Sequence, residues 1–262
     1  MSFGETVSQI TKSSEPSAFP KGLSFFDPHL QHYVDETLAI GGEAYISSTA
    51  NGEISGLFIY DDSERSGTVF TRSREVFGYF YELKPFDTLF AEVKTEHKCE
   101  TYDIYNIDLE KTSIDYRFSN EISMAEREQR DEIRQFMELT HPGTNKNWVN
   151  VSLDNGDQCF TVRLEDEIAG LGWASNFNGA GRLHSLYVKP QFRGLGIGRD
   201  LVLARLLWLR SKGAHSAFSE ISRENTASTR IAVTAQMKVS GQVFQYARTG
   251  PMVAVQPRVT AV

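Results

Sequence analysis

Cysteine is nearly absent from the sequence, which has only Cys99 and Cys159 among 262 residues. Two cysteines are too few for the disulfide framework of a small secreted domain, and their spacing fits no metal-binding cluster. We therefore expect two free thiols that fill apolar space, no metal site, and a cytoplasmic protein.

Long hydrophobic runs are absent as well. No apolar stretch approaches the roughly 18 residues that a membrane-spanning helix needs, so we expect no such helix and no membrane partner. The first 22 residues also lack the apolar centre of a signal peptide. They are polar and rich in serine and threonine, which predicts a flexible arm over residues 1–22.

Positive charge is scarce, since 27 Lys and Arg residues face 34 Asp and Glu residues and the net charge is −7. This balance argues against a nucleic-acid partner. The segment from Arg182 to Lys212 is different, because seven cationic residues there accompany a single acid, Asp200. A basic segment in an acidic protein indicates a local anionic ligand. For Arg205 and Arg210 we expect the solvated face of a helix instead.

The apolar content of 40% is enough for a substantial core. In the first part of the chain, hydrophobic spacing and turn residues predict a series that begins with a helix capped by Asp27 and Pro28 and ended by Gly41. Asn51-Gly52 is a typical hairpin turn. The remaining predicted elements are two strands over 44–60 joined at that turn, a strand over 68–72, a helix over 74–83 and a strand over 89–93.

A second series of elements is predicted from Asp115 onwards. Ser123 and Glu126 form a possible capping box before a helix that ends at His141. In chain order, the predicted elements are a strand over 115–118, that helix, two strands within 159–175, a strand over 182–188, a helix from Ile197 to Gly213, a strand over 217–222, a helix from Asn225 and a strand over 243–247.

The two series resemble each other. EISGLFI at residues 53–59 matches EIAGLGW at residues 167–173, and FAEVKTEHK at 90–98 matches FSEISRENT at 218–226. The second series has about 14 more residues between these matches. That insertion contains QFRGLGIGRD (residues 191–200), which has no counterpart in the first series. We therefore predict an internal duplication in which only the second copy carries the glycine-rich segment.

A glycine-rich turn between a strand and a helix allows backbone N–H groups to converge on an anion such as a phosphate. A P-loop is excluded because Arg199-Asp200 stands where Lys-Ser/Thr is required. A dinucleotide fingerprint needs a different glycine spacing. Glu220 stands where a ribose-binding acid would, but only about 40 residues follow it, too few for the remaining units of that fold. A structural turn without a ligand stays an alternative.

The stretch LHSLYVKPQFRGLGIGRDLV (residues 183–202) resembles the coenzyme A motif of the GNAT superfamily of N-acetyltransferases, Arg/Gln-x-x-Gly-x-Gly/Ala. It fits from Arg193 and, in an overlapping register, from Gln191. Asn225 resembles the next family motif, and the likeness covers about residues 115–250. It implies a mixed α/β GNAT fold with a mostly antiparallel sheet flanked by helices. Two tandem domains would follow: a degenerate one over 23–112 without a coenzyme A loop, and a catalytic one over 113–262.

The resemblance also implies acetyl-CoA as the cofactor and assigns residues to it. Backbone of Leu186, Tyr187 and Val188 would pair with the pantetheine arm and polarise the thioester carbonyl. Asn225 and Ser228 would make contacts further along. The backbone N–H groups that would hold the pyrophosphate belong to Arg193, Gly194, Leu195, Gly196, Ile197, Gly198 and Arg199.

In this family the amine attacks the thioester directly, so catalysis is mostly positioning plus the removal of one proton. Glu220-Ile-Ser-Arg223 resembles a Leu-Glu-Val-Arg stretch whose glutamate is the base in ribosomal-protein N-terminal acetyltransferases. Glu92 occupies the matching place in the first series, so a structural role for the glutamate stays open. His184 is the second candidate base.

The tyrosine that usually serves as the acid in this family is missing, because position 232 is Ala232. Tyr246 is the expected substitute, or release of the thiolate needs no acid. The predicted reaction is acetyl transfer to a primary amine of a small molecule or protein, by a monomer or homodimer. Two alternatives remain: a coenzyme A-binding regulatory protein without turnover, and transfer of a longer acyl chain.

Overall fold

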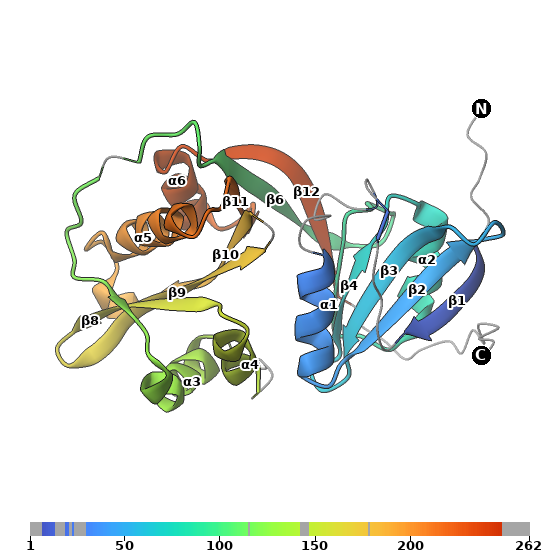
Figure 1. Cartoon of the computed structure of the whole chain (residues 1–262), viewed down its shortest axis with the longest axis horizontal. Helices are drawn as coiled ribbons and strands as arrows, with labels where there is room; N and C mark the ends of the chain where they lie inside the picture. The colour runs from blue at the N-terminus through green and yellow to red at the C-terminus, as the bar shows by residue number, and fades with distance from the viewer. Residues whose placement is uncertain are drawn as a thin grey trace. The chain divides into compact units, whose positions relative to one another are not determined.

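The computed structural model describes residues 7–13, 19–20, 23, 30–114, 116–141, 147–177 and 179–247. These residues form two compact units (Figure 1). The first comprises the described residues of Met1–Tyr102 and Gln242–Val262, and the second comprises those of Asp103–Gly241. The second unit thus begins ten residues before the predicted boundary, and the described residues from Gln242 onwards are grouped with the first unit.

The first unit contains the predicted hairpin, which is confirmed as β2 (Glu43–Thr49) and β3 (Ile54–Asp61). Gly52 in the connecting turn has φ +80°, a backbone conformation that favours glycine. β4 (Ser66–Phe70) continues the antiparallel order, and β5 (Thr88–Ala91) then lies parallel to β4. The sheet order is β1-β2-β3-β4-β5-β12.

The amino-terminal residues correct one expectation. Val7–Ser13 form β1, which pairs antiparallel with β2 from Val7↔Thr49 to Ser13↔Ala44. A flexible arm is therefore wrong for these seven residues. Val7, Ile10 and Thr11 are β-branched residues, which favour strands, and Ile10 is buried.

Two helices cover this sheet. α1 (Leu30–Ala39) buries Leu30 and Val34 completely, as its predicted apolar stripe requires, whereas its predicted cap at Asp27 and Pro28 lies outside the described residues. α2 (Arg74–Leu83) has the predicted bounds, and its N-cap Ser73 accepts a hydrogen bond from the backbone of Val76. The core beneath α2 is rich in aromatic rings and includes Phe58, Tyr60, Phe77, Phe80, Tyr81, Phe86 and Tyr246.

Glu43 on β2 lies in a charged cluster that stabilises the first unit. Burial alone would raise the pKa of Glu43, but hydrogen bonds from Lys12, Lys84 and Tyr45 outweigh burial and lower this pKa from 4.5 to about 2. A carboxylate whose pKa is lower in the folded state adds stability above pH 4.5 and loses that contribution as the pH falls toward 2. The difference corresponds to about 3 kcal/mol.

We therefore expect Glu43→Gln to lower the free energy of unfolding by up to about 3 kcal/mol at pH 7. The deficit relative to the wild type should shrink between pH 4.5 and pH 2. Urea unfolding at a series of pH values, followed by circular dichroism, measures this. Glu53→Gln in the exposed hairpin turn is the control, and a deficit for Glu43→Gln that does not change with pH would contradict the assignment.

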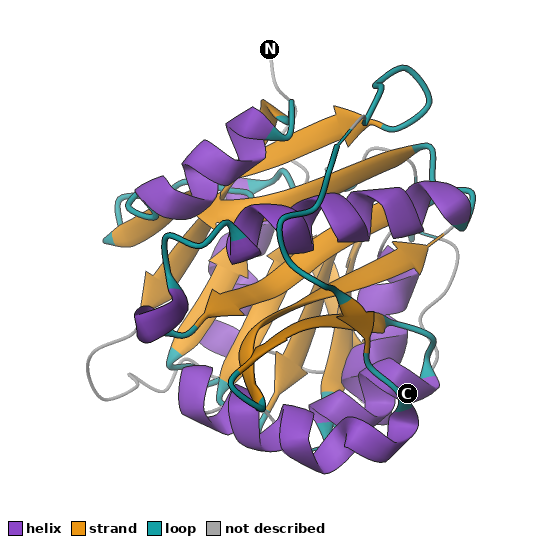
Figure 2. Ribbon diagram, turned by 90° about the vertical axis from the view of Figure 1, so that its left-hand side faces the viewer, coloured by secondary structure: helices purple, strands orange, loops and turns teal. Residues whose placement is uncertain are grey.

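The second unit has the sheet order β6-β11-β10-β9-β8-β7. Helices lie on both faces of the strands (Figure 2). In the second unit, α5 (Ile197–Ser211) and α6 (Thr226–Thr234) are on one face, and α3 (Arg130–Thr140) and α4 (Trp148–Asp154) are on the other (Figure 1). The strands on which the site depends are antiparallel neighbours β8 (Gln158–Leu164), β9 (Glu167–Phe177) and β10 (Ala180–Val188), followed by β11 (Ser216–Ser222).

Two expectations for the second unit are wrong, and one helix was missed. Residues 116–118 form no strand, and β7 is only Ser123–Met124. The capping box is formed by Glu126 and Gln129 rather than by Ser123, before a short 3-10 turn and α3 (Arg130–Thr140). A further helix, α4 (Trp148–Asp154), was not predicted.

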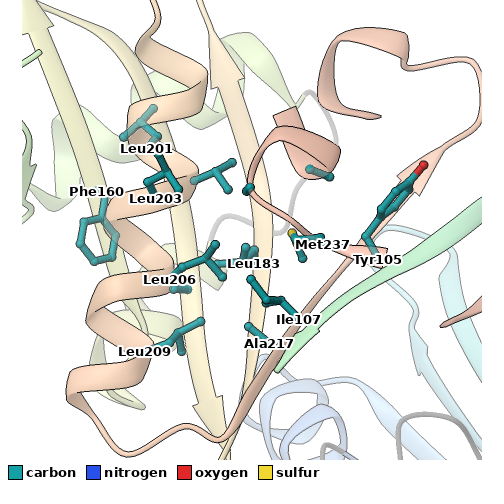
Figure 3. Packing of buried hydrophobic residues seen from close by; sticks show 14 of the residues in the cluster. Tyr105, Ile107, Phe160, Leu183, Leu201, Leu203, Leu206, Leu209, Ala217 and Met237 are labelled. Atoms are coloured by element: carbon teal, nitrogen blue, oxygen red, sulfur yellow. The ribbon is translucent and has the colours of Figure 1, made fainter. Parts of the chain in front are cut away.

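The core between α5 and the sheet is made mainly of aliphatic side chains. Leu201, Leu206 and Leu209 of α5 are completely buried, and Leu206 and Leu209 lie toward Leu183 of β10 and Ala217 of β11 (Figure 3). This packing holds α5 firmly against β10 and β11. The glycine-rich segment between β10 and α5 is therefore held at both ends by rigid elements.

Two long strands pass from one unit to the other. β6 (Cys99–Asp108) begins in the first unit and is the neighbour of β11 in the second. β12 (Lys238–Ala247) begins in the second unit and pairs with β5 in the first, with Phe244 opposite Ala91. β6 thus follows the first series in the sequence but completes the strands of the second unit. β12 follows the second series but completes the strands of the first unit.

The internal matches occupy equivalent places in the two units. EISGLFI falls on β3 and EIAGLGW on β9, each the second strand of an antiparallel hairpin. In both units, a helix then connects the next two strands, which are parallel: α2 connects β4 to β5, and α5 connects β10 to β11. This correspondence supports the predicted duplication.

Candidate active site

The end of β10 parts from β11 in the second unit. Their parallel pairing runs from Ala180↔Ser216 to Arg182↔Phe218 and stops there, although β10 continues to Val188 and β11 to Ser222. The register of β10 on its other neighbour, β9, is shifted between His184 and Tyr187, and Ser185 has φ +49°. This β-bulge turns β10 away from β11, so the two strands separate where the predicted site lies.

The first unit lacks this separation. There, β4 and β5 stay paired up to Val69↔Ala91, and Ala91 is the last residue of β5. The connection from β4 to α2 contains no glycine-rich segment and is capped by Ser73. Only the second of the two parallel pairs therefore has both a separated strand end and a glycine-rich loop.

The loop has the backbone geometry of an anion cradle. Gly194 and Gly196 have φ +84° and +80°, which side-chain-bearing residues rarely adopt. A Cβ at Gly194 would meet no atom within 4 Å, so the backbone there borders open space. The N–H groups of Gly194, Leu195 and Gly196 have no acceptor among the described residues, and those of Ile197 to Arg199 are in the first turn of α5, where no intrahelical acceptor exists.

These observations fit a pyrophosphate, because the donors converge next to the positive end of the α5 dipole. Arg193 differs from the expectation, since its N–H donates to the carbonyl of Pro190 at 3.3 Å. Its guanidinium donates to the carbonyl of Val188 and lies over the ring of Tyr187. Arg193 therefore ties the loop to the end of β10 in this structure.

A buried carboxylate, Asp200, supports the loop through hydrogen bonds to residues 116–120, and this role was not predicted from the sequence. It is completely buried and accepts hydrogen bonds from the Tyr116 hydroxyl at 3.0 Å and from the backbone N–H of Ser119 at 3.0 Å. The backbone and side-chain amides of Asn120 donate to it at 2.9 and 2.8 Å. Asn120 also donates to the carbonyl of Leu195, so residues 116–120 support the loop directly.

The two candidate bases lie on the same face of the sheet. Leu183 packs in the core under α5, so its neighbours Arg182 and His184 point to the opposite face. Ala217 and Ile221 of β11 also belong to the core under α5, which places Glu220 on the face shared by Arg182 and His184. The structure thus places Glu220 and His184 on one face of the sheet, on the two strands that part there.

Each candidate base has defined partners. Both carboxylate oxygens of Glu220 lie 3.3 Å from the guanidinium of Arg182. His184 has Ser175 Oγ at 3.0 Å from Nε2 and Ser185 Oγ at 3.4 Å from Nδ1. These contacts fix the orientation of both side chains before any substrate is bound.

Aromatic side chains surround the site on this face. The Trp148 ring on α4 lies 5.7 Å from the ring of His184, and the Phe136 ring on α3 lies 6.0 Å from that of Tyr187. The His141 ring lies 6.2 Å from Tyr187, and burial lowers the pKa of this histidine. The helices α3 and α4 therefore provide an apolar wall opposite α5, which sequence spacing alone did not indicate for α4.

The remaining predicted residues are placed as follows. Asn225 is the N-cap of α6 and accepts a hydrogen bond from the backbone of Ser228 at 3.0 Å, so its side-chain oxygen is engaged in the helix start. Tyr246 lies in the core of the first unit, completely buried, and its hydroxyl donates to the carbonyl of Val93. The role of substitute acid for Tyr246 is therefore not supported, because the hydroxyl is a structural group of the other unit.

Arg205 corrects a further expectation. Both Arg205 and Arg210 were expected on a solvated face of α5. Arg205 is only 1% exposed, whereas Arg210 is exposed as expected. Both cysteines are free thiols, and Cys159 is buried. Within the described part of the chain, no helix is long and apolar enough to cross a membrane, and no three metal-ligating side chains cluster.

Comparison with known proteins agrees with this geometry. Residues 115–233 match the model of the acetyltransferase (GNAT) family. No curated protein matches the chain. Among solved structures, a GCN5-related N-acetyltransferase from Sphaerobacter thermophilus is 14% identical with a TM-score of 0.57, and the match covers 84% of this chain and 87% of that one.

Two further structures are similar over most of their length. A GNAT-family acetyltransferase from Colwellia psychrerythraea is 11% identical with a TM-score of 0.55 and is matched over 92% of this chain and 100% of that one. A tandem GNAT protein from the clavulanic acid biosynthesis pathway is 11% identical with a TM-score of 0.55, over 79% and 83% of the two chains. At these identities the likeness concerns the fold. With the family match, it establishes that residues 115–233 of this mixed α/β chain are a GNAT acetyltransferase domain.

Proposed function

We propose that the second unit transfers the acetyl group of acetyl-CoA to a primary amine. The observation that carries this proposal is the parting of β10 from β11 beside the glycine-rich loop, a combination that the first unit lacks. The family match over residues 115–233 supports the same reaction class. The first unit is proposed to be a degenerate copy that binds no coenzyme A.

The backbone of the second unit would hold the cofactor. N–H groups from Gly194 to Arg199 would bind the pyrophosphate, and the free edge of β10 from Leu186 to Val188 would pair with the pantetheine arm. Asn225 and Ser228 at the start of α6 would lie further along the arm. The bound cofactor supplies an activated thioester, and the chain supplies its orientation.

Glu220 is proposed to accept the proton of the attacking amine. It lies on the same sheet face as His184, at the separated strand ends. The aromatic side chains of α3 and α4 cover this same face. Arg182 orients the carboxylate of Glu220. No acid is assigned. Ala232, at the position of the usual tyrosine, has no proton to donate and is buried in the core, and a thiolate leaves readily as an anion.

The test is the release of free thiol from acetyl-CoA over a panel of amines that includes polyamines, aminoglycosides, lysine peptides and peptides with free N-termini. Turnover on at least one class is the expected result, and that class identifies the acceptor. Tight binding of coenzyme A without turnover on any amine would favour a regulatory coenzyme A-binding protein. Turnover with longer acyl-CoA donors alone would revise the donor.

A further inference from the structure

Arg205 is a buried cation without an acidic partner among the described residues. Its Nε donates to the carbonyl of Leu201 at 3.0 Å, and its Nη1 donates to the carbonyls of Trp173 at 3.0 Å and His184 at 3.2 Å. Burial lowers the pKa of Arg205 to about 9, so the guanidinium remains charged at neutral pH. Burying a charge against neutral carbonyls costs stability relative to an apolar side chain of the same shape.

The two strand carbonyls that Arg205 contacts are at the bulge of β10. His184 is the residue directly opposite Trp173 and the last one in regular register before the shift. Ser185, with φ +49°, follows at once. Arg205 therefore binds the backbone of β10 and β9 where the bulge begins, next to the segment from Leu186 to Val188 whose edge is free.

The sequence makes room for this contact. A Cβ at Gly172 on β9 would lie 2.9 Å from Cζ of Arg205, so a side chain at this position would displace the guanidinium from its present place against the strand backbone. Glycine within a strand often marks the close approach of another group. The match EISGLFI in the first unit has phenylalanine, Phe58, at the corresponding place. The pairing of a glycine with a buried arginine is therefore a feature of the unit that carries the loop.

We propose that Arg205 is a positioning residue for the acetyl thioester. It holds the bulge at His184 and Ser185 in the conformation that presents the free backbone edge of β10, and it places a buried positive charge next to that edge. A positive charge in a low-dielectric surrounding stabilises the negative charge that develops on a carbonyl oxygen under attack. This inference rests on the proposed acetyltransferase function.

The test compares Arg205→Met and Arg205→Lys with the wild type, and uses Arg210→Met on the exposed face of the same helix as the control. For Arg205→Met, we expect kcat to fall about 10- to 100-fold while the KM for acetyl-CoA and the affinity for desulfo-coenzyme A stay within about threefold. Arg205→Lys keeps a charge and should recover part of kcat. Amide hydrogen exchange over residues 184–188 of the cofactor-free protein should accelerate in Arg205→Met.

Gly172→Ala perturbs the same contact with the charge retained, and it should also lower kcat and accelerate this exchange. If Arg205→Met does not fold, the same measurements on Arg205→Lys and Gly172→Ala test the proposal. An unchanged kcat in the folded variants, or losses of kcat, cofactor affinity and melting temperature in the same proportion, would overturn the proposal. Absence of turnover in the wild type would instead count against the proposed function, and the exchange of residues 184–188 would still report whether Arg205 holds the bulge.

Discussion

Gly196→Asp should lower the affinity for coenzyme A by at least about 100-fold, which corresponds to about 2.7 kcal/mol. The substitution places a carboxylate among the N–H groups that would hold the pyrophosphate. Aspartate tolerates a positive φ better than most residues, and a negative charge at the start of a helix is favourable. The variant should therefore stay folded, and isothermal titration calorimetry with coenzyme A measures the loss.

Gly213→Asp is the matched control. Gly213 has the same φ of +80° and stands just beyond the other end of α5, where a Cβ would meet nothing within 4 Å. A negative charge at this end of the helix is unfavourable, so Gly213→Asp should be the less stable of the two and still bind coenzyme A. Equal losses of affinity in both variants would contradict the assignment of the loop.

Glu220→Gln should lower kcat by about 10²- to 10⁴-fold, the range that general base catalysis provides. Glutamine keeps the shape of the side chain and a hydrogen-bond acceptor for Arg182, but it cannot take a proton from an ammonium group. The affinity for the cofactor should be unchanged. Steady-state kinetics of thiol release and calorimetric titration with coenzyme A measure the two quantities.

The control for this variant is Glu92→Gln. Glu92 stands at the place in the first series that matches Glu220, in the unit without a loop or separated strands. This variant should leave kcat as it is. If Glu220→Gln retained the wild-type kcat, Glu220 would not be the base, and His184 would be the remaining candidate.

The sequence predicted those parts of the fold whose signals are local. The Asn51-Gly52 turn, the bounds of α2 and the strand-loop-helix around Gly194 and Gly196 follow from residue types that only a few backbone conformations accommodate. The bulge at Ser185 was not anticipated from the sequence, because serine carries no comparable signal.

Contacts between distant segments were the main source of error. Arg205 was expected in solvent because charged side chains on a helix usually face water, whereas Gly172, 33 residues earlier, opens a place for it in the sheet. Gly172 was the available signal. Asp200 was noted only as a lone acid in a basic segment, since its partners at Tyr116 and Asn120 lie about 80 residues away.

Tyr246 was misassigned for a related reason. Its position near the end of the second series suggested a place in the second unit, but β12 carries it into the core of the first. The strand β6 was not predicted at all. It corresponds to β12, because it follows the first series in the sequence and lies beside β11 in the second unit. Neither strand pairs with a sequence neighbour through a tight turn, so no local pattern reveals its partner.

The crossing of β6 and β12 has a consequence for how the protein can evolve. Because the first series is followed by the strand that neighbours β11 in the second unit, a deletion that removed the first series through β6 would also remove that neighbour. The strand β12, which follows the second series, in turn pairs with β5 of the first unit. Under the proposed assignment, a copy without a ligand site would therefore be kept by selection on its sister, because the two copies share the strands of one sheet.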